Sequence, residues 1–135
     1  MKAGVFSVLF LFAFLFNSTA QSETGPCNLT ISLLTCTPGE ELYSSFGHSA
    51  FRVQDYSTGT DLVYNYGTFD FNDPAFYSKF VKGKLLYFVS PEYFQNFMYQ
   101  YAYEGRGVTE QVLNLNCTQK QELLQALQGK YEGRK

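Results

Sequence analysis

Apolar side chains recur along this chain with two different periods, and the periods predict both strands and helices. Leu29, Ile31 and Leu33 alternate within residues 28–35, which favours a strand there. Alternation returns over 49–54 and 62–66, on the two sides of the turn signal Ser57-Thr58-Gly59. Residues 48–66 are therefore predicted to form a β-hairpin with a loop of about five to seven residues.

The second half of the chain mixes helix signals with further strands. Asp73 is predicted as an N-cap with Pro74 at the first helical position, and Gly83 ends that helix. Ser90-Pro91-Glu92 predicts the start of a second helix that runs to about Tyr103. The other predicted elements are strands over 84–90 and 108–115 and a helix over 118–127. This order lacks a strict βαβ rhythm and contains no internal repeat, so the predicted class is α+β.

The first twenty residues have the pattern of a signal peptide. A basic Met1-Lys2 precedes an apolar run over 3–16, and small residues follow at Ser18-Thr19-Ala20. The run is shorter than the roughly 20 residues that span a bilayer, and no second run of that length occurs, so no transmembrane helix is expected after cleavage. The predicted organisation is a signal peptide over 1–20, a lead-in over 21–30, one domain over 31–128 and a short tail over 129–135.

Composition excludes one class of function. Without Lys2, the exported part has 9 basic and 12 acidic side chains, so a nucleic-acid binder driven by phosphate contacts is not expected. The same part keeps nine Phe and eleven Tyr, which is typical of a folded domain.

The three cysteines, Cys27, Cys36 and Cys117, all lie in the exported part. One disulfide with one free thiol and three free thiols are both compatible with the sequence. No pair has the spacing of a zinc site, and the chain has a single His, so neither a metal nor another cofactor is expected.

His48 is the first candidate for chemistry, because imidazole suits general-base catalysis. Asn65 is the candidate that would orient its ring, and Cys36 and Cys117 are the candidate nucleophiles. Each has a structural alternative: a hydrogen-bonded core His or Asn, a small buried Cys, or a Cys beside a helix cap at Asn116 or Thr118. The residues expected to line a pocket around the ring are Glu41, Tyr43, Gly47 and Tyr66.

Several segments together resemble a known family, the Lnb N-terminal periplasmic domain. The resemblance covers roughly residues 31–127 and is specific in combination. The segments that carry it are Leu33-Leu34-Thr35-Cys36-Thr37-Pro38-Gly39-Glu40-Glu41-Leu42-Tyr43-Ser44-Ser45-Phe46-Gly47-His48-Ser49-Ala50-Phe51-Arg52-Val53, Val63-Tyr64-Asn65-Tyr66-Gly67-Thr68-Phe69-Asp70-Phe71, Lys79-Phe80-Val81-Lys82-Gly83-Lys84-Leu85 and Tyr103-Glu104-Gly105-Arg106.

This resemblance implies a periplasmic domain of Gram-negative bacteria, typical of Bacteroidota. Lnb is a lipoprotein N-acyltransferase, so the implied partners are a lipoprotein N-terminus and a lipid acyl donor. The implied fold is a permuted papain-like (NlpC-type) domain, an antiparallel hairpin plus helices, in which a strand-borne His precedes the Cys nucleophile. His48 matches that His and would be the base of a thiol-dependent acyl transfer.

In this family the nucleophile is expected in an Asn-Cys-Ser/Thr segment after the last helix seen here. Asn116-Cys117-Thr118 imitates that segment but precedes a helix, so Cys117 is interpreted as a coincidence at a helix cap, too far from His48 to share a hydrogen bond. The domain is therefore expected to be truncated at Lys135 and inactive alone, with Cys36 as the only alternative nucleophile. A non-catalytic binding or remnant module and a cysteine peptidase or amidase are the rival hypotheses. The sequence leaves the oligomeric state open.

Overall fold

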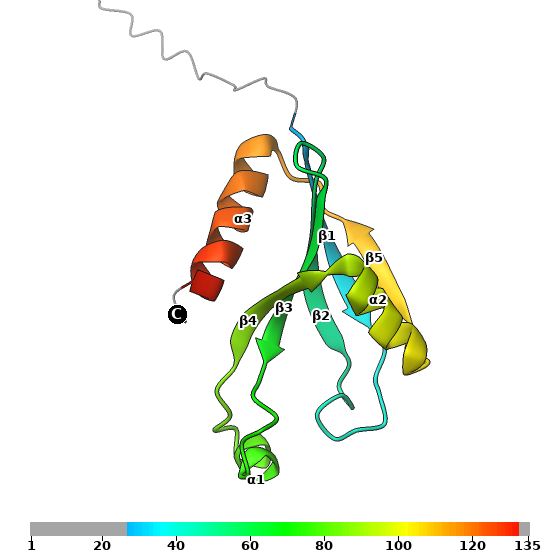
Figure 1. Ribbon diagram of the computed structural model, residues 1–135, viewed down its shortest axis with the longest axis vertical. Coiled ribbons are helices and arrows are strands. Elements are labelled where there is room, and N and C mark those ends of the chain that lie inside the picture. Colours follow the sequence, from blue (N-terminus) through cyan, green and yellow to red (C-terminus); the bar gives the residue numbers. More distant parts are fainter. Residues whose placement is uncertain (1–26, 133–135) are drawn as a thin grey trace, which may run out of the picture.

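The computed structural model describes residues 27–132, which contain a five-stranded antiparallel sheet (Figure 1). The strand order is β4-β3-β2-β1-β5. The predicted α+β class is confirmed. The strands are β1 (Leu29–Cys36), β2 (His48–Asp55), β3 (Thr60–Thr68), β4 (Phe88–Tyr93) and β5 (Val108–Val112). The predicted signal peptide lies outside the described residues.

Strand register places the residues that matter for function. In the β1/β2 pair Cys36 is opposite His48. In the neighbouring pairs Ala50 is opposite Asn65, and Asn65 is opposite Ser90. Since side chains alternate between the faces of a sheet, His48 and Asn65 share the face of Ala50.

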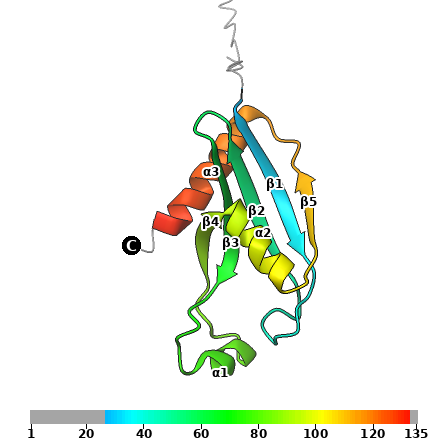
Figure 2. The same ribbon diagram turned by 45° about the vertical axis from the view of Figure 1, so that its right-hand side comes forward.

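Two helices cover opposite faces of the sheet (Figures 1 and 2). One core cluster packs Leu34 and Val63 against Phe97 of α2 (Phe94–Tyr103). The other packs strand residues, Ile31 among them, against Leu127 of α3 (Cys117–Glu132). Side chains on alternate positions of β1, β2 and β3 therefore belong to two different cores, because both faces of these strands are covered.

The helix α1 (Phe76–Val81) begins later than predicted. Pro74 and Ala75 form a turn before it, and Asp73 accepts hydrogen bonds from the backbone N–H of Ala75 through its side chain and of Phe76 through its carbonyl, both 2.9 Å. Asp73 therefore organises a turn that leads into the helix, and Pro74 is not its first residue.

The prediction around Pro91 was wrong. Ser90, Pro91 and Glu92 do not open a helix; they belong to β4, which pairs with β3 from Phe88 to Tyr93. The predicted strand over 84–90 is correspondingly displaced, and α2 begins at Phe94. Because β4 is at the edge of the sheet, it can accommodate a proline.

The end of the domain where β1 and α3 begin is closed by a disulfide and a capped helix. Cys27, before β1, is bonded to Cys117, the first residue of α3. Asn116 and Gln119 exchange backbone-to-side-chain hydrogen bonds of 2.9 and 3.0 Å, which form a capping box. The helix continues to Glu132, beyond the predicted end at residue 127. Within residues 27–132 no helix has the length and apolar character needed to cross a membrane.

Candidate functional site

A tight loop between β1 and β2 delivers His48 to the start of β2. The loop is held by backbone hydrogen bonds from Gly39 and Gly47 to the carbonyl of Ser44, each 3.0 Å. Gly47 has φ +77°, and a Cβ at this position would lie 2.6 Å from the carbonyl oxygen of Cys36. Only glycine fits so close an approach, so Gly47 fixes the point at which His48 enters the sheet.

The imidazole of His48 is part of a chain of three side chains on neighbouring strands. Its Nε2 is 2.9 Å from Oδ1 of Asn65, a residue that is 9% exposed. The Nδ2 of Asn65 in turn donates to Oε1 of Glu92 on β4. His48, Asn65 and Glu92 thus form a continuous imidazole–amide–carboxylate chain across β2, β3 and β4.

These hydrogen bonds favour one tautomer of a neutral imidazole. An ionised carboxylate only accepts hydrogen bonds, so the amide nitrogen of Asn65 faces Glu92 and the amide oxygen faces His48. An amide oxygen accepts only, so Nε2 of the neutral ring carries the proton. The lone pair that can receive a proton from a substrate or nucleophile is then on Nδ1 of His48.

His48 and Asn65 lie in a large cleft at the end of the sheet that carries α1. The cleft has a volume of about 1520 Å³. The loop after β1, the end of β3, the region of α1 and the end of α2 all contribute to it. The polar and ionisable side chains that line it include those of Glu41, Tyr43, His48, Asn65, Tyr66, Ser90, Glu92, Tyr101 and Arg106.

One wall of the cleft is aromatic. The ring of Tyr43 contacts Phe69 and Phe71 edge-on, with centroids 5.7 and 5.0 Å apart. Phe71 is 57% exposed, and Phe46, on the same loop as Tyr43, is 86% exposed. The cleft therefore presents an apolar surface beside a polar one, which suits a ligand with an acyl chain and a polar head.

Cys36 is enclosed beside the cleft and does not line it. It is 3% exposed within the α2 core cluster. Burial raises the pKa of its thiol, and this outweighs the hydrogen bond that it shares with Tyr101 and the charge of Arg106, both of which lower that pKa. A reactive thiol needs the opposite setting, an accessible site with a lowered pKa.

Arg106 closes the same corner of the cleft. Its Nε donates to the carbonyl of Thr37 and its Nη1 to Glu104, both at 2.9 Å, and its guanidinium lies 4.5 Å from the centroid of the Tyr101 ring. The hydrogen bond from Arg106 lowers the pKa of Glu104. Its side chain is 9% exposed and ties the end of α2 to the β1 loop.

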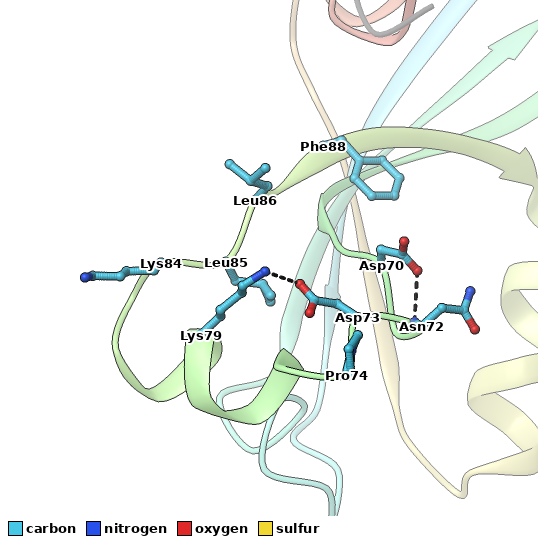
Figure 3. A pocket seen from close by; sticks show the side chains of 9 residues that line it. All are labelled: Asp70, Asn72, Asp73, Pro74, Lys79, Lys84, Leu85, Leu86 and Phe88. Atoms are coloured by element: carbon cyan, nitrogen blue, oxygen red, sulfur yellow. Dashed lines mark hydrogen bonds and ion pairs between the residues drawn. The ribbon is translucent and has the colours of Figure 1, made fainter.

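A second hollow of about 900 Å³ lies beside α1 (Figure 3). Its acidic groups are engaged locally: Asp70 accepts from the backbone N–H of Asn72 at 2.9 Å, and Asp73 pairs with Lys79 at 2.6 Å. The Lys79 hydrogen bond lowers the pKa of Asp73. Across residues 27–132 no group of three or more His, Cys, Asp or Glu side chains is arranged to hold a metal ion.

The structure brings together some of the residues singled out in the sequence and separates others. His48 meets Asn65 as predicted, and three of the four predicted lining residues, Glu41, Tyr43 and Tyr66, line the cleft. Gly47 does not, because it packs on the Cys36 carbonyl. Cys117 is held in the disulfide.

Glu92 was missed in the sequence because Ser90-Pro91-Glu92 was interpreted as a helix start. Tyr101 was also not identified as a site residue in the sequence, and it lies against Cys36 and Arg106. The apolar run Leu85-Leu86-Tyr87-Phe88-Val89, which ends directly before Ser90, is a signal that could have extended a strand as far as Glu92.

These features define an α+β domain with a hydrogen-bonded imidazole at the base of an aromatic-walled cleft. Comparison with known families gives the same answer as the resemblance of the sequence segments. The chain belongs to the family of the Lnb N-terminal periplasmic domain, which matches residues 16–132. It is thus a module of a periplasmic, exported type. No curated protein and no solved structure gives a match.

Proposed function

We propose that the cleft is the base-bearing part of a thiol-dependent acyl-transfer site, with His48 as general base and Asn65 as the residue that orients it. The observation that supports this most directly is the 2.9 Å hydrogen bond between His48 Nε2 and Asn65 Oδ1. It leaves Nδ1 as the proton acceptor and restrains rotation of the ring. The resemblance to permuted papain-like enzymes, in which a strand-borne His precedes the nucleophile, points the same way.

The reaction has two balanced steps. In the first, Nδ1 of His48 takes the proton of a thiol as its sulfur bonds to the acyl carbonyl carbon, and the leaving oxygen of the donor departs with that proton. In the second, an amine attacks the thioester, a C–N bond forms as the C–S bond breaks, and the proton of the amine passes through His48 to the departing sulfur. No redox group or metal takes part in either step.

Support for an acyl-chain substrate comes from the wall of the cleft. Exposed apolar side chains on the β1 loop and near α1, Leu42, Phe46 and Val81, lie on the same cleft as His48. Burying a chain against such a surface would gain about 0.8 kcal/mol for each methylene. We propose a lipid as acyl donor and the amine of a lipoprotein N-terminus as acceptor, as the family resemblance implies.

The thiol is proposed to come from outside residues 27–132. Among the described cysteines, Cys27 and Cys117 are bonded to each other, and Cys36 is enclosed in the α2 core with a raised thiol pKa. Cys36 is opposite His48 in the strand register, which keeps it as the alternative nucleophile. Burial argues against that alternative, because it shields the thiol and raises its pKa.

Export through a cleaved signal peptide at residues 1–20 is part of the same proposal. A disulfide such as Cys27–Cys117 is stable in an oxidising compartment outside the cytoplasm. Intact-mass measurement of the exported protein should give a chain that begins at Gln21. A mass that includes residues 1–20 would contradict this part of the proposal.

A second function is favoured by a separate observation. Within residues 27–132 the only free thiol is buried, so the domain on its own could bind an apolar ligand without reacting with it. A cysteine peptidase or amidase would use the same base but would pass the acyl group to water. The three hypotheses therefore differ in the fate of an acyl donor.

The deciding experiment gives a labelled phospholipid and a diacylated lipopeptide to the natural protein, read through any coding sequence that follows Lys135, and to residues 1–135 alone. We expect acyl transfer to the lipopeptide amine by the natural protein, loss of transfer in His48→Ala, and no turnover by residues 1–135. Turnover by residues 1–135 that is lost in Cys36→Ser would move the nucleophile to Cys36. Release of free fatty acid would favour hydrolysis, and binding without turnover would favour the binding module.

A further inference from the structure

Among residues 27–132 Glu92 has no ion-pair partner and no hydrogen bond to His48, and yet it ends the hydrogen-bonded chain that holds His48. It lies on β4 opposite Val63, while Asn65 is opposite Ser90, so Glu92 approaches Asn65 diagonally across the sheet. Its Oε1 accepts from Nδ2 of Asn65, which is buried, while Glu92 itself is partly buried. The contact joins residues 27 positions apart in sequence.

The contact removes an ambiguity that a side-chain amide carries. The oxygen and nitrogen ends of Asn65 have nearly the same shape, and either end could face His48. With Glu92 in place, turning the amide over would bring two acceptor oxygens together and leave the amide nitrogen without the carboxylate. The chemistry of Glu92 therefore selects one of the two orientations.

We propose that Glu92 is a positioning residue that sets the tautomer of His48 through Asn65. By holding the amide oxygen toward Nε2, it keeps the proton on that nitrogen and the lone pair on Nδ1. The consequence for catalysis rests on the proposed acyl transfer, whereas the effect on the imidazole does not. A residue that only supported the β3/β4 pairing would leave the tautomer unchanged when replaced.

The backbone around Asn65 is supported separately from Glu92. Thr68 Oγ1 lies 2.7 Å from Ser90 Oγ and donates to the carbonyl of Asn65 at 3.4 Å. These contacts and the β3/β4 ladder remain when Glu92 is changed. A variant at Glu92 can therefore alter the amide without removing its backbone support.

The single His of the chain makes the tautomer directly measurable. Nitrogen-15 NMR of the imidazole, with its couplings to the ring carbon protons, identifies which nitrogen is protonated, and hydrogen exchange measures how firmly the Nε2 proton is held. In the unaltered protein we expect the Nε2-protonated form and a slowly exchanging proton. Predominance of the Nδ1-protonated form would overturn the proposal without any variant.

Three variants complete the test. Glu92→Leu removes the acceptor, and we expect Nε2 proton exchange to rise about tenfold, the loss that follows when a hydrogen bond is no longer held. The Nε2-protonated form should also lose population. Glu92→Gln keeps an oxygen that can accept but also carries N–H groups that can donate to the turned-over amide, so it should preserve the two signals only in part. Glu122→Gln, an exposed carboxylate on α3, is the matched control and should change neither.

The outcomes separate this proposal from the proposed function. Folded Glu92→Leu with unchanged exchange and tautomer would overturn the role of Glu92, even if acyl transfer is found. If transfer is found, Glu92→Leu should lower kcat with little change in KM, and Glu92→Gln should have a kcat between those of Glu92→Leu and the unaltered protein. If no transfer is found, the NMR signals still decide the tautomer proposal, and only the catalytic consequence fails.

Discussion

The two faces of the sheet differ in what they carry, although the same strands build both. The face under α3 is an apolar core in which Ile31, Val53 and Leu127 pack together. The face under α2 begins with an apolar core around Phe97 and continues into the His48–Asn65 cleft. Alternation thus lets each strand stabilise the fold on one side and present chemistry on the other.

The polar content of the α2 side reaches beyond the cleft. Arg52 lies 3.5 Å from the centroid of the Phe94 ring and pairs with Asp61 at 2.6 Å and Glu110 at 3.0 Å. On the α3 side, the disulfide Cys27–Cys117 holds the first residue of α3. Both sides thus have a buried core, but only the α2 side continues into an open cleft. Changes at exposed cleft residues should therefore cost less folding free energy than changes in either core.

The largest expected effect is the loss of the disulfide. Replacing Cys27 and Cys117 together by Ser opens a loop of 90 residues. In the chain-entropy description this lowers the free energy of unfolding by about 4 to 5 kcal/mol. Denaturant unfolding of the double variant and of the parent measures the difference. An equal midpoint for the two proteins would show that the α3 side does not depend on this bond.

A core truncation under α3 should come next. Leu127 is 1% exposed, and Leu127→Ala should lower the free energy of unfolding by about 2 to 5 kcal/mol through lost burial and a residual cavity. The matched control is Phe46→Ala in the cleft, where an 86% exposed ring should change stability by no more than about 0.5 kcal/mol. Similar losses of unfolding free energy for both variants would contradict the contrast between the buried α3 core and the open cleft.

Cys36 tests how far the α2 core extends toward the cleft. Cys36→Ala should cost about 1 to 2 kcal/mol, because it removes one buried atom and leaves a small cavity. In the unaltered, unreduced protein, iodoacetamide should label this thiol only when denaturant is added, since burial both shields it and raises its pKa. Rapid labelling of the native protein would place the thiol in the cleft and restore it as a nucleophile.

The smallest expected effect is a change in how the free energy of unfolding depends on pH in acid. The hydrogen bond from Arg106 lowers the pKa of Glu104 in the folded state, so its contribution is full above the ordinary value of 4.5 and is lost as pH falls through the lowered pKa. Glu104→Gln should therefore be less stable than the parent at neutral pH, and the gap should shrink in acid. Thermal unfolding at a series of pH values measures it; a gap that widens in acid would reverse the sign.

Much of the fold could be predicted because its signals are local. Alternation placed β1 and the β2/β3 hairpin, and turn residues placed the loop between them, which the structure shortens to residues 56–59. A helix cap at Asn116 or Thr118 was also predicted from neighbouring residues, and the structure places it at Asn116. In these segments the local preference and the tertiary structure agree, and so the pattern was sufficient.

The errors arise where contacts distant in sequence decide the structure. Ser90-Pro91-Glu92 has the local chemistry of a helix start, but pairing with β3 makes it a strand. Glu92 was therefore not expected beside Asn65. The partner of Cys27 could not be read either, because it lies 90 residues away with no local signal. Packing likewise determined that Arg106 is shielded.

Pro91 also affects whether copies of the molecule can associate through the edges of their sheets. β4 and β5 are the two edges of the sheet, where unpaired backbone groups can recruit strands from other molecules. Proline has no N–H to offer, so it interrupts the row of donors along β4 and discourages growth of the sheet on that side. β5 contains no proline between Val108 and Val112, so any aggregation by strand addition to this sheet would begin at that edge.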